Sequence, residues 1–152
     1  MYRAGLIGLT GIGARRHSAD LTRPLTTLMP GSHAGAYALH PGIELVGVCD
    51  IRPEAREQFR ADWSDVWPEV HCCSDYRELL GLGLDFLSVC TPDHLHAQMV
   101  VDACAHPVKG ILCEKPLATT LFDADRMIEA SEASGVPMQV DHTRRWRSIY
   151  QH

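Results

Sequence analysis

The order of apolar and amphipathic segments predicts an α/β fold with a doubly wound parallel sheet. Six short runs are rich in Val, Ile and Leu and mostly lack polar alternation, as expected of parallel strands covered on both faces. Helical patterns separate these runs, and such alternation is typical of a sheet with helices on both sides. The predicted strands are Arg3–Gly8, Glu44–Cys49, Val70–Cys73, Asp85–Cys90, Gly110–Cys113 and Pro137–Val140.

Signals at the segment ends define the predicted helices. Pro53 occupies a first-turn position, where the N–H that proline lacks has no partner within the helix. Gly135 follows the last periodic residue of another segment and is typical of a C-cap. The predicted helices are His33–Leu39 with Ser32 as N-cap, Pro53–Trp63, Asp75–Leu80, His94–Ala105 and Leu121–Ser134.

The stretch 14–30 shows neither pattern, and two prolines interrupt it. We therefore predict an inserted loop between the first strand and a first helix that begins late. Long loops in compact domains are usually functional or mobile.

Length and composition predict one globular domain spanning residues 1–152. The hydrophobic fraction of 45% and the charged fraction of 22% are ordinary for such domains. A formal net charge of −5 gives neither a basic stripe for nucleic acid nor a polybasic membrane anchor. No apolar run approaches the roughly 20 residues that cross a bilayer, and no secretory signal is recognised, so we expect a cytoplasmic protein. The six cysteines form no C-x-x-C pair and are expected to be reduced and structural.

A glycine-rich turn, GLTGIG over residues 8–13, follows the first predicted strand directly. A dinucleotide needs a tight turn there, bare backbone beside the pyrophosphate and helix N–H groups that face the phosphates. The turn fits G-x-G-x-x-G with Thr10 in place of the second glycine, where a side chain can crowd the pyrophosphate. Gly8, Thr10, Gly11 and Gly13 are therefore candidate cofactor contacts, and a glycine turn without a ligand is the alternative.

Asp50 ends the second predicted strand in the run IELVGVCD. A carboxylate there can accept hydrogen bonds from both hydroxyls of an adenosine ribose and would repel the 2′-phosphate of NADP, which favours NAD. Arg52 weakens that preference because a guanidinium can pair with a phosphate, so NADP is the alternative cofactor. Asp50 could also cap the helix that begins at Pro53, and the two roles are compatible.

The segment TPDHLH over residues 91–96 leaves the carboxyl end of the strand DFLSVC. Ligands of open α/β sheets bind outside such strand ends, so Thr91, Pro92, His94 and His96 are candidate contacts near a nicotinamide ribose. The two histidines could instead form half of a metal site. No third ligand sits at a supporting spacing, and we expect no metal.

Glu114-Lys115-Pro116 follows the strand GILC and is the most specific signal in the sequence. The proline fixes the turn, and a lysine that leaves a strand end is held near a bound cofactor. Its ammonium group can orient a hydroxyl or carbonyl and stabilise a developing alkoxide. Glu114 and Lys115 are therefore candidates for the cofactor site, and Lys115 also for catalysis.

These motifs, together with HAGAYALHPGIELVGVCD, ILCEKPLATT and VDHTRRW, resemble the glucose–fructose oxidoreductase, inositol dehydrogenase and rhizopine-catabolism family over essentially the whole chain. The resemblance implies the Rossmann-like NAD(P)-binding domain of an oxidoreductase that transfers hydride between nicotinamide and a secondary alcohol of a sugar or polyol. It implies that Asp50 binds the adenosine ribose and that Lys115, the main catalytic residue, contacts the nicotinamide ribose and substrate. The remaining matches to family motifs are Gly8, Thr10, Gly13, His33 in the first helix, Thr91, Pro92, His96 and Glu114.

Members of that family continue into a second domain that supplies an Asp and a His to the substrate site. We expect that domain to be absent from residues 1–152, so that the isolated chain binds cofactor with little activity. A non-catalytic module is one alternative. Another is a subunit that associates with itself or with a partner chain, through apolar residues such as Trp146 and Ile149.

Overall fold

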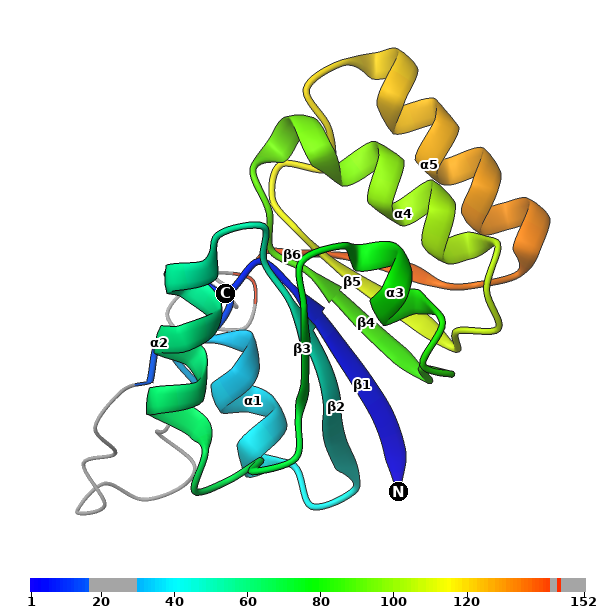
Figure 1. The fold of residues 1–152 in the computed structure, drawn as a ribbon. Helices are drawn as coiled ribbons and strands as arrows, with labels where there is room; N and C mark the ends of the chain where they lie inside the picture. Colours follow the sequence, from blue (N-terminus) through cyan, green and yellow to red (C-terminus); the bar gives the residue numbers. More distant parts are fainter. Residues whose placement is uncertain (17–29, 143–144, 146–152) are drawn as a thin grey trace.

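The structure confirms the predicted α/β fold, because one parallel sheet carries helices on both faces (Figure 1). This computed structural model describes residues 1–16, 30–142 and 145. Within that part of the chain the strands are β1 (Tyr2–Ile7), β2 (Ile43–Cys49), β3 (His71–Cys73), β4 (Phe86–Val89), β5 (Gly110–Glu114) and β6 (Met138–Asp141). Their order, β3-β2-β1-β4-β5-β6, reverses between β1 and β4. Such a switch point leaves a crevice at the carboxyl ends of the strands.

Two layers of helices cover the sheet, and they are placed nearly as predicted. Helices α1 and α2 cover one face over β1 and β2, and the other three cover the opposite face (Figure 1). The helices are α1 (His33–Leu39), α2 (Pro53–Trp63), α3 (Tyr76–Leu80), α4 (His96–Cys104) and α5 (Leu121–Ser134). The predicted helix His94–Ala105 is wrong in its first turn, because Asp93–Leu95 forms the separate 3₁₀ turn η2.

The predicted insertion interrupts a helix after its first turn. Arg15 N–H donates to Gly11 O (3.0 Å), and the next two helical bonds come from His33 N to Ile12 O and from Ala34 N to Gly13 O, both 2.9 Å. In an unbroken α-helix, residues 16 and 17 would make those two bonds. Helix α1 begins at His33, as predicted, and its first two N–H groups bond to the turn at Gly11; we call this junction the splice.

Of the predicted inserted loop, the structure describes residues 14–16 and Pro30, and the first of these segments lies against α2. The indole Nε1 of Trp63 donates to Ala14 O at 2.8 Å, and the guanidinium of Arg16 stacks over the Trp63 ring and pairs with Asp65. Residues 17–29 lie outside the described part, as do Trp146 and Ile149. Ser32 closes the splice as the predicted N-cap: it accepts from the N–H of Gly35.

The core has two layers, one on each side of the sheet. Phe59 of α2 belongs to the first layer, and Leu87 of β4 and Met127 of α5 belong to the second. Gly5 and Gly47 are paired neighbours on β1 and β2, where an added Cβ would lie 2.5 Å from leucine side chains that pack on the sheet. The two bare positions therefore let this leucine layer, which includes residues of α3, approach the sheet closely. All six cysteines are free thiols, as predicted.

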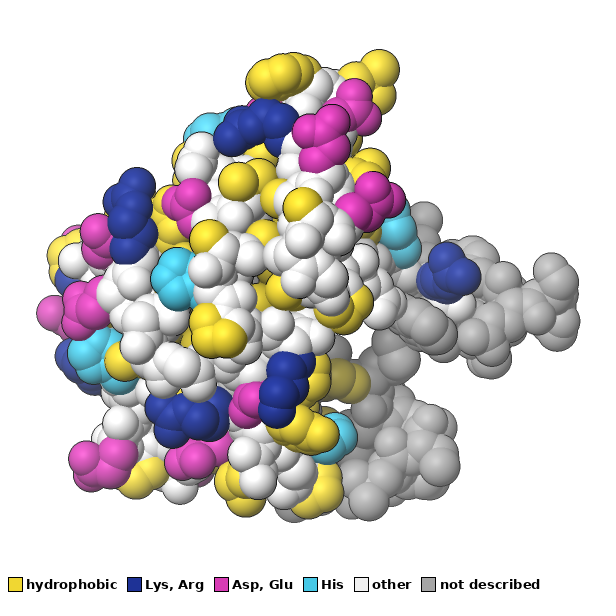
Figure 2. Space-filling view, turned by 90° about the vertical axis from the view of Figure 1, so that its right-hand side faces the viewer, with side chains coloured by type: hydrophobic (Ala, Val, Ile, Leu, Met, Phe, Trp, Pro, Cys, Tyr) yellow, Lys and Arg dark blue, Asp and Glu magenta, His cyan; other side chains and the backbone are white. Residues whose placement is uncertain are grey.

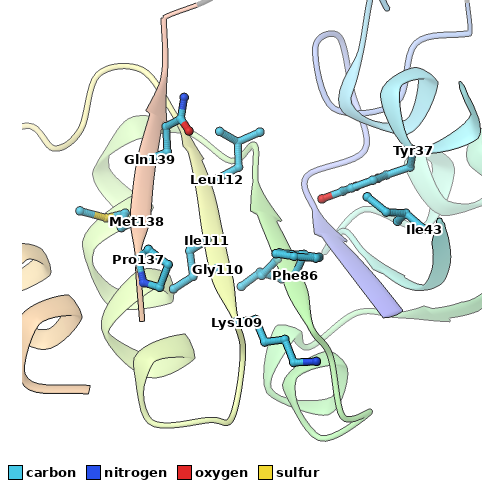
Figure 3. A pocket seen from close by; sticks show the side chains of 11 residues that line it. Tyr37, Ile43, Phe86, Lys109, Gly110, Ile111, Leu112, Pro137, Met138 and Gln139 are labelled. Carbon is cyan, nitrogen blue, oxygen red and sulfur yellow. The ribbon is translucent and has the colours of Figure 1, made fainter. Parts of the chain in front are cut away.

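The α1 side of the sheet is hollowed where β4, β5 and β6 lie (Figure 3). Apolar side chains dominate this hollow of about 560 Å³, with Phe86 and Leu112 on the strands and Tyr37 facing them from α1. The face shown in Figure 2 carries acidic and basic side chains interspersed, without a field of one sign. Among the described residues, no helix has the length and apolar composition to cross a bilayer.

Candidate functional site

A cleft of about 480 Å³ opens where the sheet order reverses, at the carboxyl ends of β1, β2 and β4. This is where open α/β sheets bind ligands. Four separate parts of the sequence meet in its wall, and the predicted contacts in it come from three of them. The predicted residues that line it are Gly8, Thr10, Asp50, Arg52, Thr91, Pro92 and His94.

The three glycines of the turn have different structural roles. Gly8 has φ +91°, and a Cβ there would lie 2.4 Å from the carbonyl oxygen of Cys90. Gly13 is buried below the cleft, and its Cβ would lie 2.0 Å from the carbonyl oxygen of Gly8. Gly11 also has a positive φ but faces open space. Thr10 is exposed at the cleft, so the residue that departs from the glycine pattern stands where a phosphate would approach.

Asp50 connects the glycine turn to Arg52, the residue before α2. Its Oδ2 accepts from the N–H of Leu9 at 3.0 Å, and its Oδ1 accepts from the N–H of Arg52 at 2.9 Å. Burial acts to raise the pKa of Asp50, but the bonds from Arg52 and Leu9 outweigh it and hold the pKa below its ordinary value. Neither N–H belongs to α2 itself, so capping of that helix by Asp50 is not observed.

Arg52 closes over the carboxylate from the solvent side. Its Nη2 lies 3.1 Å from Asp50 Oδ2 and 3.3 Å from Thr10 Oγ1, and its side chain is 54% exposed. The guanidinium therefore covers the Asp50 carboxylate inside the cleft.

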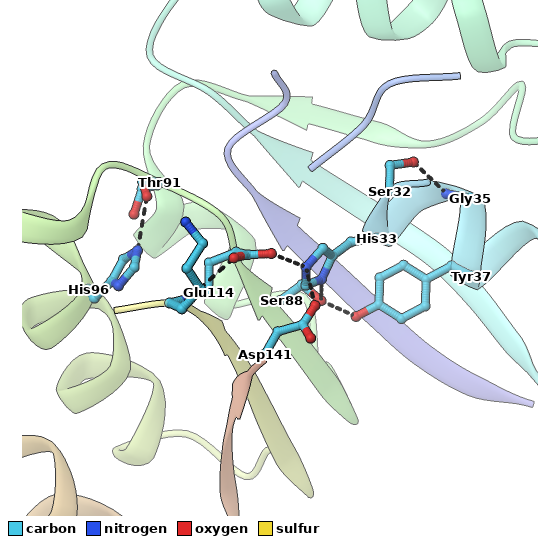
Figure 4. Close-up of polar contacts among 10 residues, drawn as sticks. Ser32, His33, Gly35, Tyr37, Ser88, Thr91, His96, Glu114 and Asp141 are labelled. Atoms are coloured by element: carbon cyan, nitrogen blue, oxygen red, sulfur yellow. Dashed lines mark hydrogen bonds and ion pairs between the residues drawn. The ribbon is translucent and has the colours of Figure 1, made fainter. Parts of the chain in front are cut away.

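The TPDHLH segment divides between the cleft and the protein interior. His94 is exposed at the rim, whereas His96 is buried and its ring lies between two backbone carbonyls, Thr91 O and Pro116 O, each at 2.9 Å (Figure 4). His96 therefore connects the two motifs from below instead of lining the cleft. Among the described residues, neither of the two groups of possible metal ligands includes His94 or His96.

Glu114 is the last residue of β5 and Lys115 follows it, and their side chains point to different surroundings. Lys115 is exposed, and Glu114 is buried with Oε2 accepting from the Lys115 N–H (3.2 Å) and Oε1 3.2 Å from His33 Nε2 (Figure 4). Burial acts to raise the pKa of Glu114, and the hydrogen bond and attraction of His33 overcome it, so the pKa lies below its ordinary value. His33, predicted as a cofactor contact, thus lies behind Glu114 rather than in the cleft wall.

Sequence reasoning missed three polar residues that surround His33. Ser88 Oγ lies 2.9 Å from His33 Nδ1 and 2.6 Å from the hydroxyl of Tyr37, and Asp141 Oδ2 lies 3.6 Å from His33 Nε2. Burial and the charge of Glu114 raise the pKa of Asp141. For Ser88 and Asp141 the one available signal was a polar residue inside or at the end of a predicted strand, which by itself names no partner.

Comparison with known proteins places the chain in a family. The family model described as "Oxidoreductase family, NAD-binding Rossmann fold" matches residues 2–142. Inositol 2-dehydrogenase of Salmonella typhimurium is 31% identical over 150 residues, which are 97% of this chain and 39% of that protein. Inositol 2-dehydrogenase 1 of Saccharopolyspora erythraea is 33% identical over 146 residues, 95% of this chain and 38% of the relative.

A solved structure agrees with these relatives. The WlbA dehydrogenase from Bordetella pertussis, in complex with NADH and UDP-GlcNAcA, matches with a TM-score of 0.71 at 27% identity, over 95% of this chain and 36% of that one. The chain therefore spans less than two fifths of each of these proteins. The predicted family, fold and cofactor class are confirmed: the chain belongs to the glucose–fructose oxidoreductase, inositol dehydrogenase and rhizopine-catabolism family of oxidoreductases and forms its NAD-binding Rossmann domain.

Proposed function

We propose that the cleft binds NAD(H) with Asp50 on the adenosine ribose, the turn at Gly8 on the pyrophosphate and Lys115 beside the nicotinamide ribose. The observation that supports this most is the convergence of three sequence-distant motifs at the switch point of the sheet. The spliced helix supports it as well, because the turn at Gly11 keeps a helical N-terminus next to the phosphate position.

The proposed reaction of the whole protein is reversible hydride transfer from a secondary alcohol of a sugar or polyol to nicotinamide C4. When bound, NAD⁺ would accept the hydride of the carbinol C–H bond, and the hydroxyl proton would pass to the His that the family resemblance assigns to the second domain as the carbonyl forms. The ammonium group of Lys115 is exposed at a strand end, where it can orient the oxygen and stabilise the alkoxide. The inositol dehydrogenases and the WlbA complex with NADH and UDP-GlcNAcA support this substrate class.

For the 152-residue chain, the proposal is cofactor binding with little or no turnover. The family resemblance assigns an Asp and a His of the substrate site to a second domain, and correct positioning can be worth about 7–11 kcal/mol of the barrier. The apolar hollow of Figure 3 favours association with another chain, which the mass in solution tests. A cytoplasmic location fits the six free thiols.

Titration with NADH, and separately with NADPH, tests the cofactor proposal by nicotinamide fluorescence or calorimetry. We expect saturable binding with NADH preferred, because Asp50 disfavours a 2′-phosphate. A folded chain that binds neither cofactor contradicts the proposal.

The chain has only two lysines, which provides a matched control for Lys115. Lys109 is exposed and paired with Asp85 at 2.7 Å, away from the cleft. Lys115→Ala should weaken NADH binding, whereas Lys109→Ala should not. Bound NADH should likewise protect Lys115, and not Lys109, from acetylation by a small anhydride. Equal protection of both lysines would remove Lys115 from the site.

A further inference from the structure

A buried polar cluster lies directly behind the Glu114–Lys115 peptide. The His33 ring, from α1, is its centre and meets side chains from the ends of three neighbouring strands (Figure 4). Nδ1 faces Ser88 of β4 at 2.9 Å, and Nε2 faces Glu114 of β5 at 3.2 Å and Asp141 of β6 at 3.6 Å. The side chains of His33 and Glu114 are only 4% and 8% exposed, so water cannot replace these contacts.

The two carboxylate oxygens of Glu114 have different partners, one in the buried cluster and one in the loop after β5. Oε1 faces His33, and Oε2 accepts from the backbone N–H of Lys115. Rotation of the carboxylate away from His33 would also move the oxygen that holds this N–H. The orientation of the His33 ring is fixed in turn by Ser88, whose hydroxyl is held at 2.6 Å by Tyr37.

The cluster holds two carboxylates that repel each other, and His33 acts on both. Burial and the Glu114 charge raise the pKa of Asp141, while the attractions of His33 and His142 oppose that rise. On Glu114, His33 and Lys115 overcome burial and lower the pKa. His33 therefore helps to keep Glu114 ionised, and an ionised carboxylate is the stronger acceptor for the Lys115 N–H.

We infer that His33 is a positioning residue for Lys115: it fixes the Glu114 carboxylate, which fixes the backbone of Lys115 at the cofactor. This inference rests on the proposed role of Lys115 at the nicotinamide ribose. His33, Glu114 and Asp141 could also hold a divalent cation, because their ligand atoms lie within 4.8 Å of one another. The cluster is satisfied by its own hydrogen bonds, which favours the positioning role.

A double-mutant cycle on the 152-residue chain tests whether His33 acts through Lys115. We expect His33→Gln to weaken NADH binding about tenfold in the wild-type background and less than about twofold in the Lys115→Ala background. His71→Gln is the matched control, since His71 Nε2 contacts Glu78 Oε1 at 2.7 Å in an exposed pair away from the cleft. It should leave NADH affinity unchanged.

The outcomes separate this inference from the proposed function. If Lys115→Ala weakens NADH binding and the His33→Gln effect is additive, the positioning role is wrong and the proposed function stands. If Lys115→Ala has no effect on a chain that binds NADH, the proposed role of Lys115 fails first. If a chelator removes NADH affinity and Zn²⁺ restores it, the cluster is a metal site and the positioning role is overturned.

The Lys115 amide resonance gives a second measurement that needs no cofactor. In ¹H–¹⁵N spectra of the ligand-free chain, Glu114→Gln should shift the His33 ring nitrogens, and His33→Gln should shift the Lys115 amide and increase its hydrogen exchange. A Lys115 amide that is unchanged in a folded His33→Gln chain overturns the inference.

Discussion

Asp50 and Glu114 both stand at the carboxyl ends of parallel strands, yet their partners differ in exposure. The partner of Asp50 is Arg52, whose side chain is 54% exposed, whereas the partner of Glu114 is His33, which is 4% exposed. Exposed ion pairs contribute little and exchange readily, while buried ones are fixed by their surroundings. In the proposed cofactor site, the partner of Asp50 can therefore exchange with a ligand. The Glu114 carboxylate is not among the residues that line the cleft, and its buried partners hold it fixed.

The largest expected effect concerns the backbone of the glycine turn. Gly13→Ala places a Cβ 2.0 Å from the Gly8 carbonyl oxygen, a rigid backbone atom, and should lower the free energy of unfolding by about 3 kcal/mol and abolish NADH saturation. Gly11→Ala meets no atom within 4 Å and should cost only about 1 kcal/mol, from its positive φ. Thermal or urea unfolding measures both. Equal losses of unfolding free energy in the two variants would show that the glycine turn rearranges freely.

The next effect compares the two carboxylates. Glu114→Gln should lower the free energy of unfolding at pH 7 by about 1–3 kcal/mol, because it replaces a buried acceptor held by His33. The pKa of Glu114 is lowered on folding, so the charge stabilises the fold above pH 4.5 and that contribution is lost as the pH falls below it. The wild-type and Glu114→Gln curves of unfolding free energy against pH should therefore converge in acid. Parallel curves would contradict the lowered pKa.

Asp141 should show the opposite sign. Its pKa is raised on folding, so its charged form opposes folding and wild-type stability is lost as the pH rises through the folded pKa. Asp141→Asn should make the protein about 0.5 kcal/mol more stable at pH 7, and the difference should vanish below pH 3.8. Chemical denaturation at several pH values measures it. A destabilised variant at pH 7 would mean that attraction to His33 outweighs repulsion from Glu114.

Arg52→Ala should leave stability within about 0.5 kcal/mol and change cofactor choice instead. Removal of the guanidinium leaves Asp50 free to bind the ribose hydroxyls and takes away a partner for a 2′-phosphate. The ratio of NADPH to NADH dissociation constants should therefore rise. A ratio that falls would mean that Arg52 favours NADH over NADPH.

The smallest effect on NADH affinity is expected from deleting the inserted segment. Deletion of residues 16–32 joins Arg15 to His33, and the bonds from His33 to Ile12 O and from Ala34 to Gly13 O then become ordinary helical bonds. The exposed Arg16–Asp65 pair is lost with the segment, which costs at most about 1 kcal/mol. We expect unchanged NADH affinity, measured by the same titration. Lost affinity in a folded deletion variant would assign the segment a role in binding.

The sequence predicted the elements well because their signals are local. Caps at Ser32 and Gly135 fixed helix ends, and apolar runs located each strand within one residue. The cleft residues were predictable for the same reason, since each follows a strand end. The His33 cluster was not, because its bond to Ser88 joins residues 55 apart and a lone serine in an apolar run has no periodic signal. The splice was not predicted for a similar reason, since its hydrogen bonds join residues on either side of the inserted segment.

The two contacts of His96 have a mechanical consequence. One ring holds the carbonyl of Thr91 and the carbonyl of Pro116, which belong to the loops after β4 and β5. If either loop moved outward alone, its carbonyl would leave the ring of His96, a residue that is only 1% exposed. The two loops should therefore open together, with a shared rate of amide hydrogen exchange. The imidazole of His96 thus couples the motion of the Thr91 loop, which lines the cleft, to that of the loop after β5.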